Sequence, residues 1–210
     1  MTTYFKATRP NGTDFRTGKV KYEVGKRVRP LPHDGERELC GPGYLHASDT
    51  PSETLVGGSW PCRLFKVEGE PAVGFSRCYP HKGGFKQLTV VREIEAWRAL
   101  GPNGREVAEL IDRAGRLTGE EIDKLDAAWR AARRAPRVAA RVAAQVAARD
   151  AARYAARDAA SDAARVAARA AARGTARDAA SDAAAALVVR DLIYEEYFNT
   201  LHGPWKAAVG

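Results

Sequence analysis

The amino-acid sequence predicts an α+β protein in which a small β-rich domain precedes an extended all-α region. Short runs of alternating apolar and polar residues, separated by Gly and Pro, fill residues 1–91 and are typical of strands. Apolar residues at helical spacing follow in residues 92–136 and indicate short helices. An Ala/Arg repeat then opens residues 137–210, where we expect one long helix and a C-terminal amphipathic helix.

The strands expected in the N-terminal domain are rich in aromatic and β-branched residues. They cover residues 2–8, 19–24, 44–48, 62–67, 72–77 and about 85–91. Between them, Asp49, Pro51 and Glu53 supply the polar cap, early proline and early acid of a helix start. We interpret Gly57-Gly58 and Gly83-Gly84 as turns.

Three short helices are expected between the sheet and the repeat. The first covers residues 93–100, and the second covers residues 105–114, with Gly115 placed to end it. Thr118 and Glu121 have the spacing of a capping box, in which each side chain accepts a hydrogen bond from the other residue's backbone N–H. A third helix therefore begins here, and its apolar stripe consists of Ile122, Leu125 and Trp129.

The repeat at residues 137–186 has the form Arg-X-Ala-Ala, and 26 of its 50 residues are Ala and 9 are Arg. Both are strong helix formers, so we expect a rod of roughly 75 Å. Because four residues exceed the helical period, each Arg lies about 40° further round the rod than the one before. The small Ala faces permit close helix approach, within a hairpin or between chains. Gly174 interrupts the repeat, and we expect a kink or a continuous helix there.

Larger apolar residues return after the repeat and form a face that needs a partner. They are Leu187, Val188, Leu192, Ile193, Tyr197, Phe198 and Leu201. Gly203-Pro204-Trp205 is expected to end the helix that carries them.

Charge and hydropathy restrict the classes of partner. The chain carries a net charge of +8, with 34 Lys and Arg against 26 Asp and Glu, spread without a dense basic block. A basic chain admits nucleic acid as a partner. No apolar run approaches the roughly 20 residues of a membrane span, and the N-terminus lacks the apolar stretch of a signal peptide. We therefore expect no membrane partner, a cytoplasmic location and reduced cysteines.

Several short stretches of the N-terminal domain form a pattern. They are Tyr22-Glu23-Val24-Gly25-Lys26, Leu39-Cys40, the run from Gly43 to Ser48, Pro51 and the run from Arg63 to Glu68. The pattern, over about residues 4–75, resembles an uncharacterised family of bacteriophage and bacterial proteins with a short N-terminal domain of no assigned activity. The downstream part from Leu117 is similar to tails of actinobacterial and actinobacteriophage proteins. The resemblance implies a phage origin and a bacterial host cell, and it supplies no catalytic residues.

A candidate pocket is expected at Tyr44, His46 and Ser48. Their segment resembles a motif of a small uncharacterised family related to ADP-ribosyltransferases. The resemblance implies that His46 helps to shape a nucleotide pocket. The alternative is a structural histidine whose imidazole is hydrogen-bonded at a strand edge.

Cysteine and histidine residues were considered as zinc ligands, because thiolate and imidazole are the set that zinc prefers. The set is Cys40, Cys62, Cys78, His46 and His81. Only one short ligand spacing is present where a zinc signature has two, so we expect no metal and no cofactor. The tryptophans are interpreted as packing anchors.

The leading functional hypothesis is a non-enzymatic interaction or assembly protein, because no catalytic constellation is present and the Ala-rich rod cannot bury a full core alone. Its long helix would associate with itself, giving a homo-oligomer, or dock on a protein partner. The partner-binding residues expected are Arg141, Arg149, Arg153, Arg157, Arg165, Arg169, Tyr197 and Phe198. Two alternatives remain open: a nucleic-acid-binding protein that contacts phosphates through its Arg residues, and a small nucleotide-acting enzyme with a pocket near His46.

Overall fold

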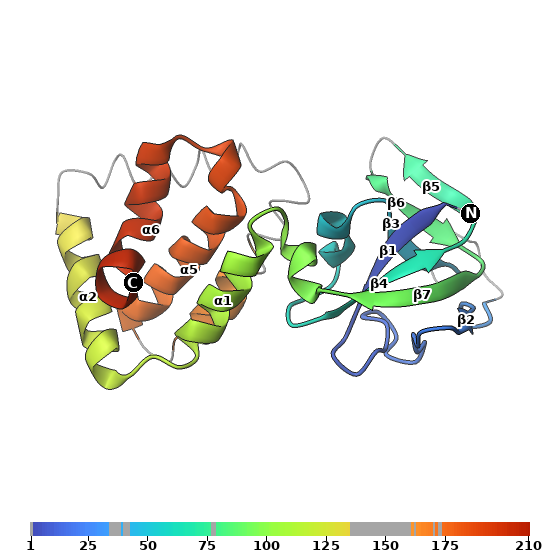
Figure 1. Ribbon diagram of the computed structural model, residues 1–210, viewed down its shortest axis with the longest axis horizontal. Coiled ribbons are helices and arrows are strands. Elements are labelled where there is room, and N and C mark those ends of the chain that lie inside the picture. The colour runs from blue at the N-terminus through green and yellow to red at the C-terminus, as the bar shows by residue number, and fades with distance from the viewer. Residues whose placement is uncertain are drawn as a thin grey trace. The chain divides into compact units, whose positions relative to one another are not determined.

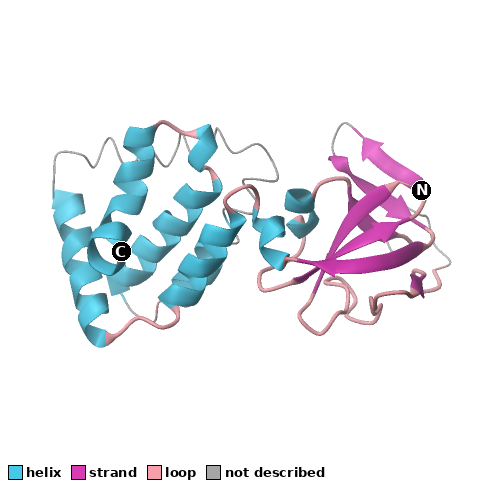
Figure 2. Ribbon diagram, in the orientation of Figure 1, coloured by secondary structure: helices cyan, strands magenta, loops and turns pink. Residues whose placement is uncertain are grey.

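The structure is a computed structural model, and it divides the chain into two compact units, Met1–Ala99 and Leu100–Gly210. It describes residues 2–33, 39, 43–76, 79–134, 161, 163–169, 171 and 174–210. Strands build the first unit and helices build the second (Figure 2). The expectation of a mixed α+β protein is confirmed at this level.

The first unit contains a seven-stranded sheet in which all neighbouring strands are antiparallel (Figure 1). The strands are β1 (Thr3–Thr8), β2 (Arg27–Val28), β3 (Leu45–Ser48), β4 (Arg63–Glu68), β5 (Pro71–Ser76), β6 (Tyr79–Phe85) and β7 (Leu88–Ile94). Their order across the sheet is β2-β7-β4-β1-β3-β6-β5. Two short 3-10 helices, η1 (Pro51–Leu55) and η2 (Ala96–Leu100), accompany them.

The middle of the sheet is paired unequally on the two sides of β1. On one side, β1 pairs with β4 at six positions, from Thr3↔Glu68 to Thr8↔Arg63. On the other side, the pairing of β1 with β3 is recorded at Phe5↔Ser48 alone among the described residues. The sheet therefore opens between β1 and β3. Its apolar core consists of Tyr4, Tyr22, Val28, Leu45, Ala47, Phe65, Val67, Phe85, Leu88 and Val90.

The strand expected at residues 19–24 is wrong. Its backbone pairs with the preceding segment as a loop, because Tyr22 N donates to the carbonyl of Gly12 and Val20 N donates to the side chain of Asp14. Only a bridge between Thr13 and Lys21 has strand character in this segment. An Asp side chain that accepts backbone N–H groups competes with a sheet ladder, and here it holds the loop instead.

The strand β6 was missed because its glycines were interpreted as a turn. Gly83 and Gly84 are buried in the sheet, where neighbouring side chains take the space of a Cβ. A Cβ on Gly83 would lie 2.7 Å from a ring carbon of Phe75, and one on Gly84 would lie 2.8 Å from a methyl carbon of Val73. Glycine is thus required there by close approach. The strand expected at about 85–91 is in fact two elements, because β6 ends at Phe85 and β7 begins at Leu88. The helix expected at 93–100 is shorter than predicted, because β7 continues to Ile94 and only the 3-10 helix η2 follows it.

The second unit contains α1 (Gly104–Ala114), α2 (Gly119–Arg134), α5 (Gly174–Val188), the 3-10 helix η3 (Arg190–Leu192) and α6 (Glu195–Val209). The capping box is confirmed at the start of α2. Thr118 N donates to Glu121 Oε2 at 2.9 Å, and Glu121 N donates to Thr118 Oγ1 at 3.3 Å. The end of α1 before Gly115 is confirmed as well.

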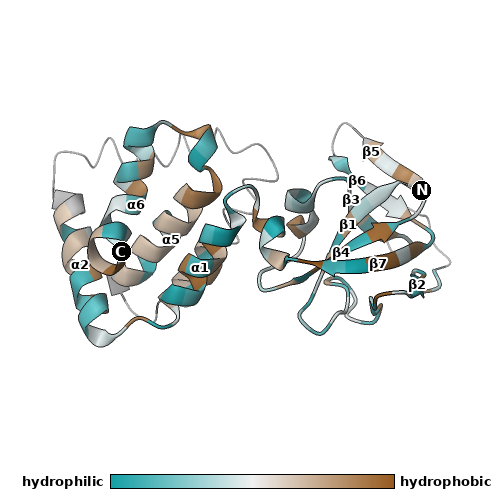
Figure 3. Ribbon diagram, in the orientation of Figure 1, coloured by the Kyte–Doolittle hydropathy of each residue, from teal (hydrophilic) through white to brown (hydrophobic). Residues whose placement is uncertain are grey.

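Helix α5 is the centre of the second unit, since it packs against α1, α2 and α6. In Figure 3, much of α5 is tan, the colour of its alanines, whereas α1 carries both teal and brown residues. The alanines that are fully buried in α5 are Ala176, Ala179, Ala180, Ala183, Ala184 and Ala186. This end of the repeat is therefore a core helix. Residues 135–160, which include about half of the expected rod, lie outside the described residues, as do residues 162 and 170 and the two residues before α5 begins at Gly174.

The expected helix end at Gly203-Pro204-Trp205 is wrong, because α6 continues to Val209. A proline inside a helix removes one backbone hydrogen bond and costs about 3 kcal/mol. Pro204 and Trp205 are both buried, together with Leu201 one turn earlier. Burial of these apolar side chains offsets the cost of the proline.

Candidate functional site

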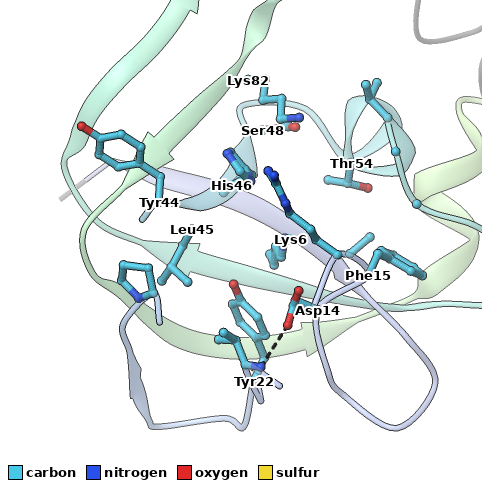
Figure 4. A pocket seen from close by; sticks show the side chains of 18 of the residues that line it. Lys6, Asp14, Phe15, Tyr22, Tyr44, Leu45, His46, Ser48, Thr54 and Lys82 are labelled. Atoms are coloured by element: carbon cyan, nitrogen blue, oxygen red, sulfur yellow. Dashed lines mark hydrogen bonds between the residues drawn. The ribbon is translucent and has the colours of Figure 1, made fainter. Parts of the chain in front are cut away.

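A cavity of about 310 Å³ lies in the first unit, where the sheet opens between β1 and β3. Its walls come from β1, the loop at residues 14–22, β3, the segment around η1 and Lys82 of β6. Figure 4 shows Lys6, Asp14, Tyr22 and His46 gathered around one space, with Tyr44 and Phe15 at opposite edges. Polar and charged groups thus meet inside the β-rich unit.

The three residues expected to form a pocket, Tyr44, His46 and Ser48, all line this cavity. His46 Nε2 donates a hydrogen bond to the backbone carbonyl of Leu39. The pKa of His46 is lowered to about 4, chiefly by burial and also by the nearby cations Lys82, Lys6 and Arg16, against the opposing effect of the Leu39 hydrogen bond. His46 is therefore neutral at pH 7. With Nε2 carrying the proton, Nδ1 keeps a lone pair.

Lys6 is the unusual residue of the cavity wall. Its Nζ lies 5.5 Å from the centroid of the Tyr22 ring. Lys6 donates no hydrogen bond to, and forms no ion pair with, any residue that the structure describes. The pKa of Lys6 is lowered from 10.5 to about 8, chiefly by burial and also by the charge of Lys82, against the opposing charge of Asp14. A half-buried ammonium without a hydrogen-bond partner is costly to the folded state.

Asp14 does not pair with Lys6, because the loop that follows it occupies its carboxylate. Thr17 N and Thr17 Oγ1 donate to Asp14 at 2.6 Å and 2.7 Å, and Val20 N donates at 2.9 Å. Burial alone would raise the pKa of Asp14, but these hydrogen bonds and the charge of Lys6 lower it. Asp14 therefore fixes the loop and only partly balances the charge of the cavity.

The remaining walls combine cations with aromatic rings. The charged side chains that line the cavity are Lys6, Arg16, Lys82, Asp14 and Glu53, which sum to one positive charge with His46 neutral. The aromatic lining residues are Phe5, Phe15, Tyr22 and Tyr44. Phe15 packs on Gly58, where a Cβ would lie 2.8 Å from the ring. Burial raises the pKa of Tyr22, so its hydroxyl is a neutral donor at pH 7.

Lys6 was missed in the sequence analysis, although a signal was present. In a strand, residues two apart share a face. Lys6 alternates with Tyr4 and Thr8, which are both buried, so it occupies an inward position of β1. A lone lysine at such a position indicates either a buried partner or a binding site. Arg16 and Lys82 gave no comparable signal, because the fold alone brings them to the cavity.

The other expected site residues divide into two groups. Arg141, Arg149, Arg153 and Arg157 lie outside the described residues. Arg165 and Arg169 are exposed in the helical stretch 163–169. Tyr197 and Phe198 are half-buried in the second unit, where they pack against Ala186 and Leu201.

The residues considered as zinc ligands are not brought together in the part of the chain that the structure describes. Cys62 is buried, while Cys40 and Cys78 lie outside that part. His81 Nδ1 donates to Asp49 at 2.9 Å near the surface, and His46 lines the cavity. Among the described residues, no group of three or more His, Cys, Asp or Glu side chains could hold a metal ion.

Comparison with protein-family models, with curated proteins and with solved structures finds no match for this chain. Within the described ranges, none of the helices combines the length and the apolar character that crossing a membrane requires.

Proposed function

We propose that the N-terminal unit binds a small anionic molecule in the cavity between β1 and β3. The observation that carries this proposal is the ammonium of Lys6, which lies half-buried on the cavity without a hydrogen-bond or ion-pair partner among the described residues. A bound anion would supply that partner. Lys82 and Arg16 line the same space and would add to its attraction for negative charge.

The cavity also restricts the size and character of the ligand. A volume of about 310 Å³ is at the lower end of the roughly 300–1,000 Å³ of small-molecule sites. The aromatic rings of Phe15, Tyr22 and Tyr44 offer apolar faces beside the cations. These features favour a molecule with one ring and one phosphate or carboxylate group. A mononucleotide, as the motif around His46 implies, belongs to this class.

Isothermal titration with simple ligands tests the proposal. We expect phenyl phosphate to bind at pH 7 and low salt, with benzoate as the carboxylate counterpart, and neutral phenol to bind at least tenfold more weakly. Lys6→Met should lower the affinity for phenyl phosphate at least tenfold, which corresponds to about 1.4 kcal/mol of binding free energy. Lys86→Met is the matched control, because Lys86 is exposed and does not line the cavity. Equal binding of phenol and phenyl phosphate would contradict the proposal.

Self-association is a second candidate function, and it would use the second unit. The observation that favours it is the exposure of two large apolar side chains next to α6: Leu192 is 51% exposed and Tyr194 is 76% exposed. A second copy of this chain, joined through these residues and through the long helix expected at residues 137–186, would cover them. Light scattering gives the absolute mass, and a monomer at micromolar concentration would contradict this candidate.

The same light-scattering run addresses nucleic acid as a partner. The run is made at low and at high salt, and the nucleic-acid absorbance is recorded together with the mass. Nucleic acid that dissociates from the protein as the salt concentration rises would indicate contacts to phosphate groups. Among the partner-binding arginines expected from the sequence, Arg165 and Arg169 are described, and both are exposed.

A further inference from the structure

We propose that Lys6 is a nucleophilic amine that condenses with a carbonyl group of the anionic ligand, so that the cavity accepts small anionic aldehydes or ketones. This inference rests on the proposed function, because the anion must first bind beside Lys6.

The surroundings of Lys6 differ from those of an ordinary surface lysine. Its side chain lies on the inward face of β1, and the cavity gives a ligand access to it. Its Nζ is placed over the Tyr22 ring and is not tied by a hydrogen bond or ion pair to any described residue. A lysine with these features is activated as a nucleophile when neighbouring cations disfavour its ammonium form. Burial and the charge of Lys82 disfavour the ammonium form of Lys6, against the opposing charge of Asp14. Lys82 and Arg16 line the same cavity and also attract the acidic group of the ligand.

The condensation consumes an amine and a carbonyl compound and releases water. The lone pair of Nζ forms a bond to the carbonyl carbon, while the π electrons move to the oxygen. A proton passes from nitrogen to oxygen to give a carbinolamine. The C–O bond then breaks, the oxygen leaves as water with a further proton, and nitrogen and carbon form the imine. No oxidant or reductant is needed.

Two neutral groups beside Lys6 are suited to these proton transfers. His46 Nδ1 carries a lone pair and accepts a proton, since Nε2 donates to the carbonyl of Leu39. The hydroxyl of Tyr22 is protonated and can donate to the developing oxygen. Positioned groups of this kind contribute to proton transfer in enzymes.

The lowered pKa of Lys6 supports the same conclusion. With a pKa of about 8, about one amine in ten is neutral at pH 7, compared with about one in 3,000 for an ordinary lysine. Lys6 should therefore react roughly 20-fold faster than an exposed lysine, after allowance for the lower nucleophilicity of a weaker base. The charged and titratable groups that share the cavity with it are Asp14, Arg16, Tyr22, His46, Glu53 and Lys82.

Borohydride trapping with pyridoxal 5′-phosphate, an anionic aromatic aldehyde, tests the inference on the full chain. The protein is incubated with one equivalent of probe at pH 7, reduced, and mapped by peptide mass spectrometry. We expect Lys6 to carry most of the label and to react roughly 20-fold faster than Lys86. Lys6→Arg, which keeps the charge, should remove this fast labelling, and Lys86→Arg should leave it unchanged.

A second ligand separates failure of the inference from failure of the proposed function. Pyridoxine 5′-phosphate carries an alcohol in place of the aldehyde and should compete with the labelling of Lys6. If it binds in a Lys6-dependent manner while the aldehyde labels all lysines alike, the imine is excluded and anion binding stands. If neither compound binds, both proposals are excluded. Fast labelling that persists in Lys6→Arg also excludes Lys6 as the nucleophile.

Discussion

The two units of this chain fill their interiors in opposite ways. The helical unit packs α5 against α1, α2 and α6 and buries a row of alanines between them. The β-rich unit instead leaves an opening of about 310 Å³ beside β1 and places Lys6, Asp14 and His46 on its walls. The first arrangement serves packing, since the buried face of α5 consists largely of small alanines that let the neighbouring helices come close. The second arrangement costs stability, because it holds a cation half-buried without a hydrogen-bond or ion-pair partner among the described residues.

The difference indicates which unit carries the binding chemistry. Proteins tolerate buried, imperfectly satisfied polar groups chiefly where function needs them. The interior of the helical unit serves packing, and we expect that its side chains could be exchanged for other apolar side chains of equal total volume without a change in ligand binding. The β-rich unit contains the groups whose replacement should change what the protein binds. Substitutions in each unit can test this division.

The largest effect is expected from Trp129→Ala in the helical unit. Trp129 of α2 is fully buried, and removing a buried Trp side chain costs about 3–5 kcal/mol through lost burial and the space left behind. Chemical denaturation followed by helical circular dichroism measures this loss. Arg130→Ala, at the exposed neighbour, is the control and should change stability by less than about 0.5 kcal/mol. If Trp129→Ala lost phenyl phosphate binding while the β-rich unit stayed folded, the assignment of ligand binding to the β-rich unit alone would be contradicted.

A smaller loss is expected from Ala183→Leu in α5. Ala183 is fully buried in a helix that α1, α2 and α6 enclose, so added methyl groups must displace neighbours. Overpacking of this kind costs about 1–3 kcal/mol. Asp178→Leu adds bulk on an exposed position of the same helix and serves as the control for helix propensity and hydrophobicity. Equal unfolding midpoints for the two variants would show that α5 is not enclosed.

The smallest effect is expected at the capping box, and it depends on pH. Hydrogen bonds from Thr118 N and from Arg113, together with the Thr118 hydroxyl, lower the pKa of Glu121 to about 2. Since the pKa in the unfolded chain is about 4.3, the stabilisation is complete above that pH and is lost as pH falls from about 4.3 to 2. Glu121→Gln should flatten this part of the stability profile. Glu120→Gln, at an exposed ion pair with Lys124, should leave it nearly unchanged.

Local signals predicted the elements that depend on neighbouring residues. The reciprocal bonds of Thr118 and Glu121 and the end of α1 before Gly115 involve residues a few positions apart. The failures arose where distant parts of the fold decide. Gly83 and Gly84 form a strand because other side chains cover them, and α6 passes through Pro204 because that residue is buried.

The residues of the candidate site were likewise predictable only where neighbouring residues in the sequence indicate them. Tyr44, His46 and Ser48 could be singled out because they lie close together in the sequence, with His46 and Ser48 on β3 and Tyr44 directly before it. Lys82 and Arg16 could not, since the sheet order brings β6 and the loop after Asp14 to the same space. Lys6 was predictable in principle from its inward position in β1. What the sequence alone did not reveal is that the sheet opens beside it.

The most direct test measures both ligand affinity and stability of Lys6→Met. In the folded chain the pKa of Lys6 is about 8, below its value of 10.5 in the unfolded chain, so the unfolded state binds more protons between these pH values. The stability of the wild-type protein should therefore rise from pH 8 to pH 10.5, and this rise should be absent in Lys6→Met. At pH 7, we expect Lys6→Met to unfold at a higher denaturant concentration and to bind phenyl phosphate at least tenfold more weakly. A variant that is less stable than wild type and binds phenyl phosphate equally well would show that Lys6 is a structural residue and that the cavity is not an anion site.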